Sequence, residues 1–489
     1  MMTRPALVLG LACLLGAVAP PGARAQTVQG TAPAAKVAPA AAPAGLGLPD
    51  TIQVALAFAY ATNPTLQTSR AQLRATDENV PKALSGWRPQ IIISANAGKG
   101  YGYEGQESAF GQVNTSLNRT IQNVQGTVTQ PVYTGGKVWA QVHQAKNQVF
   151  STRAQLLASE ETVLFNTAQA YVNVVQDEQL LQVDINNEKI LTRQLQSTND
   201  RFRVGELTRT DVAQAEAQLA SATATRETAE GTLQAARATF EQFVGVAPPA
   251  HLAPPQPLKL PVRTIDQAQS LAGRNNPNVV AALFNDAAAR DAFDVAYAAL
   301  MPNVGIQVTA LHNKNVLGPG FSENGGQLLG TLSVPIYQGG SEYATIRQAR
   351  QQEIQARKQL EDQQRTAVQQ AASAWEQLTA ARASIASNRS AVRANEIAVE
   401  GLEREALVGS RTTLDVLIGI QQLLAAETSL VQSLASLVTS SYQVAQAVGR
   451  LTARDLSLNV PLYDDTAYYR AVKNLWIGTG DYATNDPGR

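Results

Sequence analysis

The chain contains an internal repeat, and this repeat limits the folds it can adopt more than any other feature of the sequence. One group of residues returns 213 positions later. It comprises Thr51, Ile52, Ala55, Asn63, Pro64, Ala83 and Pro89, which recur as Thr264, Ile265, Ala268, Asn276, Pro277, Ala296 and Pro302. A second group returns after 204 positions. It comprises Pro131, Tyr133, Gly135, Gly136, Gln144 and Ala145, which recur as Pro335, Tyr337, Gly339, Gly340, Gln348 and Ala349. These matches indicate a tandem duplication, with about nine extra residues (213 minus 204) between positions 89 and 131 of the first copy.

The duplication sets the domain organisation that we expect. The first structural repeat covers residues 48–250 and the second covers 262–455, with a proline-rich linker at 251–261. A C-terminal tail follows over residues 456–489. Each repeat is expected to contain a helix, a β-hairpin, a very long helix and a return helix.

The very long helices are predicted from two proline-free segments, residues 136–202 and 340–406. At 1.5 Å per residue each would measure about 100 Å, far longer than the average globular helix. The helical segments 51–84 and 210–244 together have about the same length, so they can pack end to end along the first long helix. The second copy has a matching helical segment over residues 264–300.

The second return helix carries a seam at 3.5-residue spacing, which is typical of coiled coils. The seam residues are Leu414, Leu417, Gln421, Leu424, Thr428, Val431, Ala435 and Val438. On the helices alone, an ordinary soluble coiled coil is the simpler interpretation.

Between the helices, segments of about ten residues alternate apolar and polar side chains. The apolar series are Ile91, Ile93, Ala95 and Ala97; Val124, Gly126 and Val128; Val304, Ile306, Val308 and Ala310; and Leu328, Gly330, Leu332, Val334 and Ile336. This length and a polar second face suit strands that span a membrane, with Pro131 and Pro335 at the strand exits. A soluble antiparallel sheet is the alternative. Because four strands cannot close a barrel with a lumen and open edges cannot lie in lipid, the membrane interpretation requires several chains to pool their strands.

The N-terminus has the features of a signal peptide over residues 1–25. Arg4 precedes a short apolar run, and Ala23, Arg24 and Ala25 form a cleavage site. Cys13 lies in that run, but a lipid-attachment motif would have Leu where Gly10 stands, so we do not expect lipidation. An Ala/Pro-rich flexible lead-in is expected over residues 26–47. No later apolar run reaches about 20 residues, which argues against a helical membrane anchor.

Composition and motifs exclude several functions. The 39 basic and 39 acidic residues leave no basic field for nucleic acid, and a single cysteine rules out a disulfide framework. His143, His251 and His312 are far apart in the sequence, and Gly100 to Gly105 matches a dinucleotide pattern only by its letters. We therefore expect no enzyme activity: no catalytic residue, no metal site and no cofactor.

The duplicated Pro-x-Tyr-x-Gly-Gly motif before each long helix resembles that of the TolC-like outer-membrane factors. So do the helix-tip sequences Val204-Gly205, followed by Thr210-Asp211, and Val408-Gly409, followed by Asp415. The resemblance implies an α+β membrane protein. In this fold a homotrimer forms a 12-stranded outer-membrane β-barrel, with four strands per chain, that continues as a long α-helical coiled-coil barrel.

The same resemblance implies a function. It is a passive exit duct in the bacterial outer membrane that extends into the periplasm, for type I protein secretion or multidrug efflux. The implied partners are outer-membrane lipid, a periplasmic membrane-fusion adaptor and an inner-membrane ABC or resistance–nodulation–division (RND) pump. The choice between protein and drug cargo stays open, and the alternative is a periplasm-spanning coiled-coil scaffold or adhesin-like protein without transport.

The resemblance also implies a gate at the helix tips. Asp415 in each chain would form a carboxylate ring, and Arg411 would latch onto Thr210 and Asp211. Adaptor docking falls on the tip turns at Val204, Gly205, Val408 and Gly409. Ile418 and Ala406 replace an acid and a tyrosine found in relatives, which weakens the expected cation block and closure. The alternative is that Asp211 and Asp415 only complement their helix dipoles.

Overall fold

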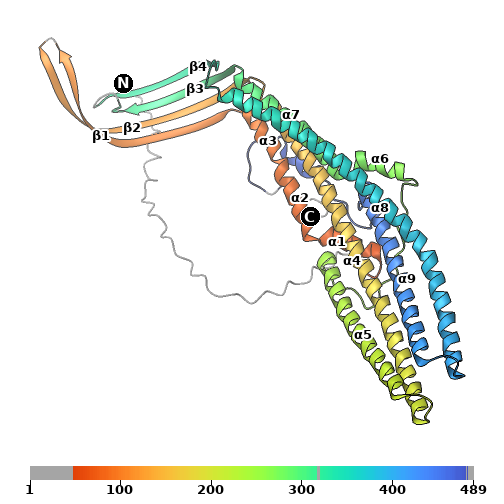
Figure 1. Ribbon diagram of the computed structural model, residues 1–489. Coiled ribbons are helices and arrows are strands. Elements are labelled where there is room, and N and C mark those ends of the chain that lie inside the picture. The colour runs from red at the N-terminus through yellow and green to blue at the C-terminus, as the bar shows by residue number, and fades with distance from the viewer. Residues whose placement is uncertain (1–47, 109, 317–319, 481, 483–489) are drawn as a thin grey trace. The chain divides into compact units, whose positions relative to one another are not determined.

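The protein has a mostly helical α+β fold with one four-stranded sheet, as seen in a computed structural model (Figure 1). The structure describes residues 48–108, 110–316, 320–480 and 482. The expected signal peptide and the expected lead-in lie outside these residues.

Two helices of 67 residues each dominate the fold: α4 (Lys137–Arg203) and α8 (Ser341–Leu407). The shorter helices are α1 (Ile52–Thr62), α2 (Pro64–Asp77), α3 (Asn79–Leu84), α5 (Arg209–Val244), α6 (Ile265–Asn275), α7 (Pro277–Tyr297), α9 (Thr413–Ala447) and α10 (Ala467–Val472). Helix α4 packs against α1, α2, α3 and α5, and also against α7 and α9. Helices α7 and α9 pack in turn against α8. The helices therefore form four neighbouring columns, with α4 inside and α8 at one edge (Figure 1).

The same asparagine contact occurs in both halves of the chain. The side chain of Asn63 accepts a hydrogen bond from the amide of Thr65 at the start of α2, and its Nδ2 donates to the carbonyl of Phe243 (3.0 Å). Asn276 caps α7 in the same way and donates to the carbonyl of Ala447 (3.1 Å). Each Asn-Pro pair thus ends one helix, starts the next and ties the break to the end of a return helix.

The helix expected over residues 51–84 is three helices in the structure. One break is the Asn-Pro pair, and the other lies at Glu78 between α2 and α3. In the second half, the expected helix over 264–300 is α6, α7 and a 3₁₀ turn (Ala298–Leu300).

The strands are β1 (Gln90–Ser108), β2 (Gly111–Thr134), β3 (Asn303–Lys314) and β4 (Ser322–Ser333). They pair in the order β1-β2-β3-β4, all antiparallel, so β1 and β4 are open edges. Directly paired residues share a face of a sheet. One row across the sheet consists of Ile91, Val128, Val308 and Leu328. The register therefore gathers the apolar series of all four strands on one face.

The other face is mainly polar, although the register also places Ile92, Leu311 and Leu329 on it. Its residues include Ser94, Asn96, Asn123, Gln125, Thr127, Thr129, Gln307, Thr309, Gln327 and Thr331. On the apolar face the side chains are not covered, since Ile91, Ile93 and Leu328 are each more than 70% exposed. The sheet thus has two chemically different faces and no described layer over its apolar one.

The strand lengths differ from the ten residues expected. Strands β1 and β2 have 19 and 24 residues, and β2 pairs with β3 only from Gln122 onward. The outer part of this hairpin pairs only with itself, in the region where the first copy has its extra residues. Strand β4 ends at Ser333, earlier than expected, and Pro131 lies inside β2 at a register shift that accommodates its missing donor.

The tail beyond the second repeat packs on the middle of the helices. Leu456, Leu458, Val460 and Tyr463 lie against a buried cluster from α1, α2, α4 and α9. Further along, the hydroxyl of Tyr468 donates to Glu78 (2.8 Å). The tail is therefore part of the folded structure as far as residue 480.

Helix α9 has a higher mean hydropathy than we expected from the sequence. Among the described helices, it is the one long and apolar enough to cross a membrane by length and composition, with a mean hydropathy of 1.3 over its best window. This helix contains no uninterrupted apolar run of 20 residues, because Gln, Glu, Ser and Thr divide it. In the structure α9 lies along α8 and α4, but only 22% of that window is buried within the chain.

Candidate functional site

The tip of each helical hairpin is a short exposed turn. Gly205 and Gly409 have φ angles of +86° and +79°, which side chains other than glycine rarely adopt. Val204 and Val408 beside them are 73% and 80% exposed. The tip residues singled out from the sequence thus form two similar knobs that present apolar side chains to the surroundings.

Both tip acids close capping boxes. The amide of Thr412 donates to Asp415 Oδ2 (3.0 Å) and the amide of Asp415 donates to the hydroxyl of Thr412 (3.3 Å). Thr208 and Asp211 make the same pair of hydrogen bonds at the start of α5. These bonds lower the pKa of both carboxyls; the backbone bond from Thr412 contributes most for Asp415, and the side-chain bond from Thr208 for Asp211. Both acids stay charged at neutral pH and complement their helix dipoles, as the simpler interpretation expected.

The structure pairs Arg411 with its own hairpin. Its Nε donates to Glu405 Oε2 (2.9 Å), a residue six positions earlier at the end of α8. Thr210 is exposed at the start of α5, and Asp211 is engaged with Thr208. The three expected latch residues are therefore each placed near a tip, and the ion pair that Arg411 makes is with Glu405.

The two hairpins meet through a different polar contact. Gln421 Nε2 of α9 donates to Gln218 Oε1 of α5 (2.9 Å). Beside it lies a small apolar cluster from four helices: Leu191, Ala222, Val399, Ala406, Val416, Leu417 and Ile420. The Gln218 contact was not predicted, because nothing in the sequence distinguishes it from the many other glutamines.

The apolar cluster beside the Gln421–Gln218 contact explains why the small residue alanine stands at position 406. Ala406 is only 7% exposed within it, so a larger side chain there would need the helices to move apart. Ile418, by contrast, is 43% exposed. The seam expected on α9 is only partly right, since Leu417 is buried but Leu414 and Gln421 are exposed.

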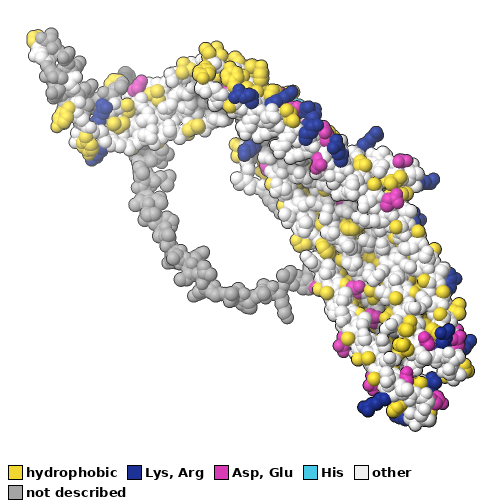
Figure 2. Space-filling view, in the orientation of Figure 1, with side chains coloured by type: hydrophobic (Ala, Val, Ile, Leu, Met, Phe, Trp, Pro, Cys, Tyr) yellow, Lys and Arg dark blue, Asp and Glu magenta, His cyan; other side chains and the backbone are white. Residues whose placement is uncertain are grey.

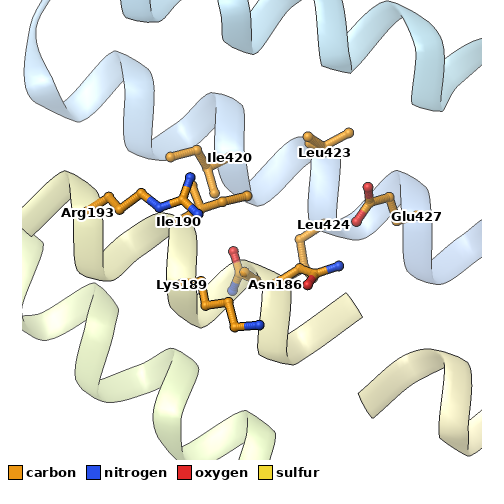
Figure 3. A pocket seen from close by; sticks show the side chains of 9 residues that line it. Asn186, Lys189, Ile190, Arg193, Ile420, Leu423, Leu424 and Glu427 are labelled. Carbon is orange, nitrogen blue, oxygen red and sulfur yellow. The ribbon is translucent and has the colours of Figure 1, made fainter. Parts of the chain in front are cut away.

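A groove lies between α4 and α9 closer to the middle of the hairpins (Figure 3). Polar side chains of α4, among them Asn186, Lys189 and Arg193, face Ile420 and Leu424 of α9 across it. Within the described part of the chain, no group of three or more His, Cys, Asp or Glu residues could hold a metal ion.

The strand-to-helix motifs position the sheet on the helices. Gly135 and Gly136 have φ angles of +65° and +85°, and Gly136 is the N-cap of α4. A Cβ on Gly135 would lie 2.4 Å from Cβ of Met301 and 3.0 Å from the carbonyl oxygen of Ala298. The first copy therefore needs glycine both for its backbone angle and for its close contact with the chain entering β3.

In the second copy of the motif, the two glycines are not packed against other residues. Gly339 and Gly340 have similar φ angles of +71° and +84°, but no atom of the described residues lies within 4 Å of the Cβ position of either. Tyr133 is 49% exposed and Tyr337 is 76% exposed, and Pro335 lies just after β4. Figure 2 shows apolar side chains gathered where the strands meet the helices.

Two buried glutamates in α4 hold the chain as it leaves α9. Glu160 accepts from the amide of Ala453 (2.7 Å) and Glu161 from the amide of Leu451 (3.3 Å). Burial raises the pKa of Glu160, and raises that of Glu161 to about 8. These acids were not identified from the sequence, where an adjacent pair of glutamates in a helix is typical of a solvated face.

Comparisons with known proteins agree with this geometry. The family model described as "Outer membrane efflux protein" matches residues 56–246 and 268–450. The outer membrane efflux protein BepC of Brucella suis is 35% identical over 432 residues, covering 88% of this chain and 92% of the relative. The outer membrane protein TolC of Escherichia coli is 26% identical, covering 81% of each chain. Among solved structures, the outer membrane protein VceC from Vibrio cholerae superimposes with a TM-score of 0.71 at 18% identity, covering 81% of this chain and 96% of the other.

Proposed function

Because this chain belongs to the outer membrane efflux protein family, we propose that it is the outer-membrane exit duct of a tripartite, envelope-spanning export system. It is an outer-membrane protein whose helices extend into the periplasm. The observation that carries the proposal is that the sheet ends in two open edges while one of its faces is apolar and uncovered.

The sheet supports a shared barrel. In lipid, the unpaired backbone groups of β1 and β4 would have no partner, so a single four-stranded sheet could not be stable there. Three copies would give 12 strands and close the barrel. The apolar face would then lie against lipid and the polar face would line a water-filled lumen.

The helices support the same assembly. In α4, the inner column, 21 of 67 residues are buried, whereas in the equally long α8 only 10 are. Much of the apolar surface of α9 is also uncovered. Four columns per chain would give a 12-column helical barrel in a trimer, in which each edge column gains a neighbour.

The family model matches two stretches of the chain, residues 56–246 and 268–450. Each stretch lies within one of the two proposed repeats, which the linker at 251–261 joins.

The duct itself would be passive. A periplasmic adaptor would dock on the tip turns and open them, and an inner-membrane ABC or RND pump would supply the energy. The similarity to BepC, an outer membrane efflux protein, favours efflux over protein secretion as the role of this chain.

The gate residues belong to the same proposal. Three copies of Asp415 would surround the axis at the tip, and a charged carboxylate ring attracts cations. Arg411, Thr210 and Asp211 would link neighbouring hairpins when the tip is closed. Exchange of Arg411 between Glu405 and these partners would be a low-energy step, because exposed ion pairs are worth about 1 kcal/mol or less.

The test is reconstitution of the purified full chain into a planar lipid bilayer, together with its subunit count in detergent. A duct should give single-channel conductance from an SDS-resistant trimer that dissociates on heating. A scaffold or adhesin without transport should give an outer-membrane protein with no conductance steps. A monomer that stays in solution without detergent would refute both the duct and the shared barrel.

A further inference from the structure

The C-terminal tail exposes two large apolar side chains that are adjacent in the sequence. After the buried Val472, the chain continues through Leu475 to Trp476, which is 66% exposed, and Ile477, which is 90% exposed. Exposed tryptophan next to exposed isoleucine is costly in water, because apolar burial is worth about 25 cal/mol per Å². The exposure of these two side chains therefore needs a physical explanation.

The segment is held in place by a specific contact. Arg88 Nη1 donates to the carbonyl oxygen of Leu475 (2.6 Å), and the guanidinium lies over the indole ring of Trp476, 4.9 Å from its centroid. Because Arg88 and Leu475 are 387 positions apart, this bond fixes the tail at Leu475 to the start of the sheet. Trp476 is therefore positioned by the fold while its outer face stays uncovered.

The contact lies at the base of the sheet. Arg88 precedes the first residue of β1 by two positions, and the carbonyl oxygen of its neighbour Trp87 accepts from Gln130 of β2 (2.9 Å). Other aromatic side chains are exposed where the strands meet the helices: Trp87, Tyr133 and Trp139 are each 43% to 57% exposed. The tail thus adds one more aromatic side chain to the junction.

The positive charges near Trp476 are also typical of a membrane interface. The cation of Arg88 lies over Trp476, and Lys473 precedes Trp476 by three positions in the sequence. Tryptophan with a neighbouring cation is characteristic of the interface between head groups and acyl chains, where the indole is half in the apolar layer and cations meet phosphates.

We propose that the tail segment around Trp476 and Ile477 is a membrane-interface anchor, which inserts these two side chains among the phospholipid head groups on the periplasmic side of the outer membrane. The anchor rests on the proposed function, because it needs the sheet to span the membrane. It ties the tail, and through Glu160 and Glu161 the middle of α4, to the rim of the barrel.

The test uses full-length chain with Trp476 as its only tryptophan, obtained by Trp87→Phe, Trp139→Phe and Trp375→Phe. The protein is reconstituted into phosphatidylcholine vesicles with and without bromine at the upper acyl carbons, which quenches tryptophan by contact. We expect Trp476 emission to be quenched strongly. Emission that is unchanged by brominated lipid would overturn the anchor, whether the side chain then faces water or a second copy of this chain.

Two matched reporters keep this outcome separate from failure of the proposed function. A chain with Trp375 alone should not be quenched, because that residue lies 34 positions into α8, about 50 Å along the helix. A tryptophan-free chain carrying Ile93→Trp on the apolar face of β1 should be quenched if the strands span the bilayer. Quenching of the Ile93→Trp reporter without quenching of Trp476 refutes the anchor alone, and absence of both refutes the membrane-spanning sheet as well.

If the tryptophan replacements prevent folding, Ile477→Cys in the otherwise native chain serves the same purpose. The chain has a single cysteine, Cys13, which lies in the expected signal peptide. A polarity-sensitive thiol label at position 477 should shift to a less polar emission on reconstitution. An unshifted label would contradict the anchor.

Discussion

At the scale of single residues, two pairs of acids in this chain have opposite pKa shifts. Asp211 and Asp415 accept capping hydrogen bonds at the exposed tips, which favours their charged forms. Glu160 and Glu161 are buried under the tail, which favours their neutral forms. Charge is thus retained at the proposed entrance and suppressed in the middle of the helices.

The buried glutamates make stability depend on pH. The folded protein keeps the proton of Glu161 up to about pH 8, whereas an unfolded chain releases it near 4.5. The free energy of unfolding should therefore fall as pH rises through this window. In Glu161→Gln that fall should be smaller, while the variant and the parent match near pH 4. Melting curves followed by circular dichroism between pH 4 and 8 give the comparison, and parallel curves would show that Glu161 does not titrate in this way.

The proposed carboxylate ring can be tested without loss of the cap. Asp415→Asn removes the charge but keeps an oxygen that accepts from Thr412. Because the ring would concentrate three negative charges around one axis, their loss should make divalent cations block the conductance several-fold less tightly. Asp464→Asn, which removes a capping acid in the tail away from the helix tips, is the control and should leave the block nearly unchanged. Equal effects of both variants would remove the ring from the mechanism.

The latch has a matched pair of variants as well. Arg411→Ser should raise conductance by removing a closing contact worth about 1 kcal/mol or less per chain. Glu405→Gln breaks the ion pair present in the structure but leaves Thr210 and Asp211 available to Arg411. If the latch uses Thr210 and Asp211, Glu405→Gln should stay as closed as the parent. A leak of the same size in both variants would instead assign the closing role to the Arg411–Glu405 pair.

At the scale of secondary-structure elements, the duplicated turn before each long helix is the same in backbone but not in packing. Gly135 and Gly339 both have positive φ, yet a Cβ meets Met301 only at Gly135. The two copies of one motif therefore offer an internal comparison between backbone strain and steric conflict.

Gly339→Ala should cost about 1–2 kcal/mol of stability, the usual cost of a left-handed residue with a side chain. Gly135→Ala should cost clearly more, because Met301 must also move. The melting temperatures of the two variants give the measurement. Addition of Met301→Ala should recover part of the loss at Gly135 and none at Gly339. A loss of equal size at both glycines would show that the contact with Met301 is relieved freely.

The sequence was informative where a signal is local and periodic. Absence of proline predicted a helix over residues 136–202, and α4 covers Lys137–Arg203. The break at Asn63 carries the Asn-Pro signal, but the break at Glu78 carries none and was missed. The long outer hairpin of β1 and β2 was also missed, since Gly98, Gly100 and Gly102 interrupt its alternation.

Side-chain partners were harder to predict than elements. Thr208 and Asp211 have the spacing of a capping box, so their pairing can be read from the sequence. The partner of Arg411 depends on the path of the turn between α8 and α9, and the contacts of Glu160 and Glu161 depend on where the tail folds back. These contacts are set by tertiary structure, and no local pattern encodes them.

At the scale of the whole molecule, the described chain is incomplete at its edges. The sheet ends in β1 and β4 with unpaired backbone groups, and the helical columns end in α8 with most of its surface uncovered. The family to which the chain belongs is one of outer-membrane proteins, in which open strand edges cannot face lipid. Closure by further copies resolves both edges with one symmetric arrangement.

Disulfide cross-linking between the two edges of the sheet tests this closure most directly. Within one chain, β1 and β4 are three strand spacings apart, about 14 Å, whereas a disulfide needs Cβ atoms about 4 Å apart. A panel that pairs Ile91→Cys or Ile93→Cys with Leu328→Cys or Leu332→Cys can therefore cross-link only different chains, and the single-cysteine variants are the controls. At least one pair should give a ladder of one, two and three chains on a denaturing gel, ending at three. A panel with no cross-link at any pair, or a ladder that continues beyond three chains, would contradict the trimeric duct.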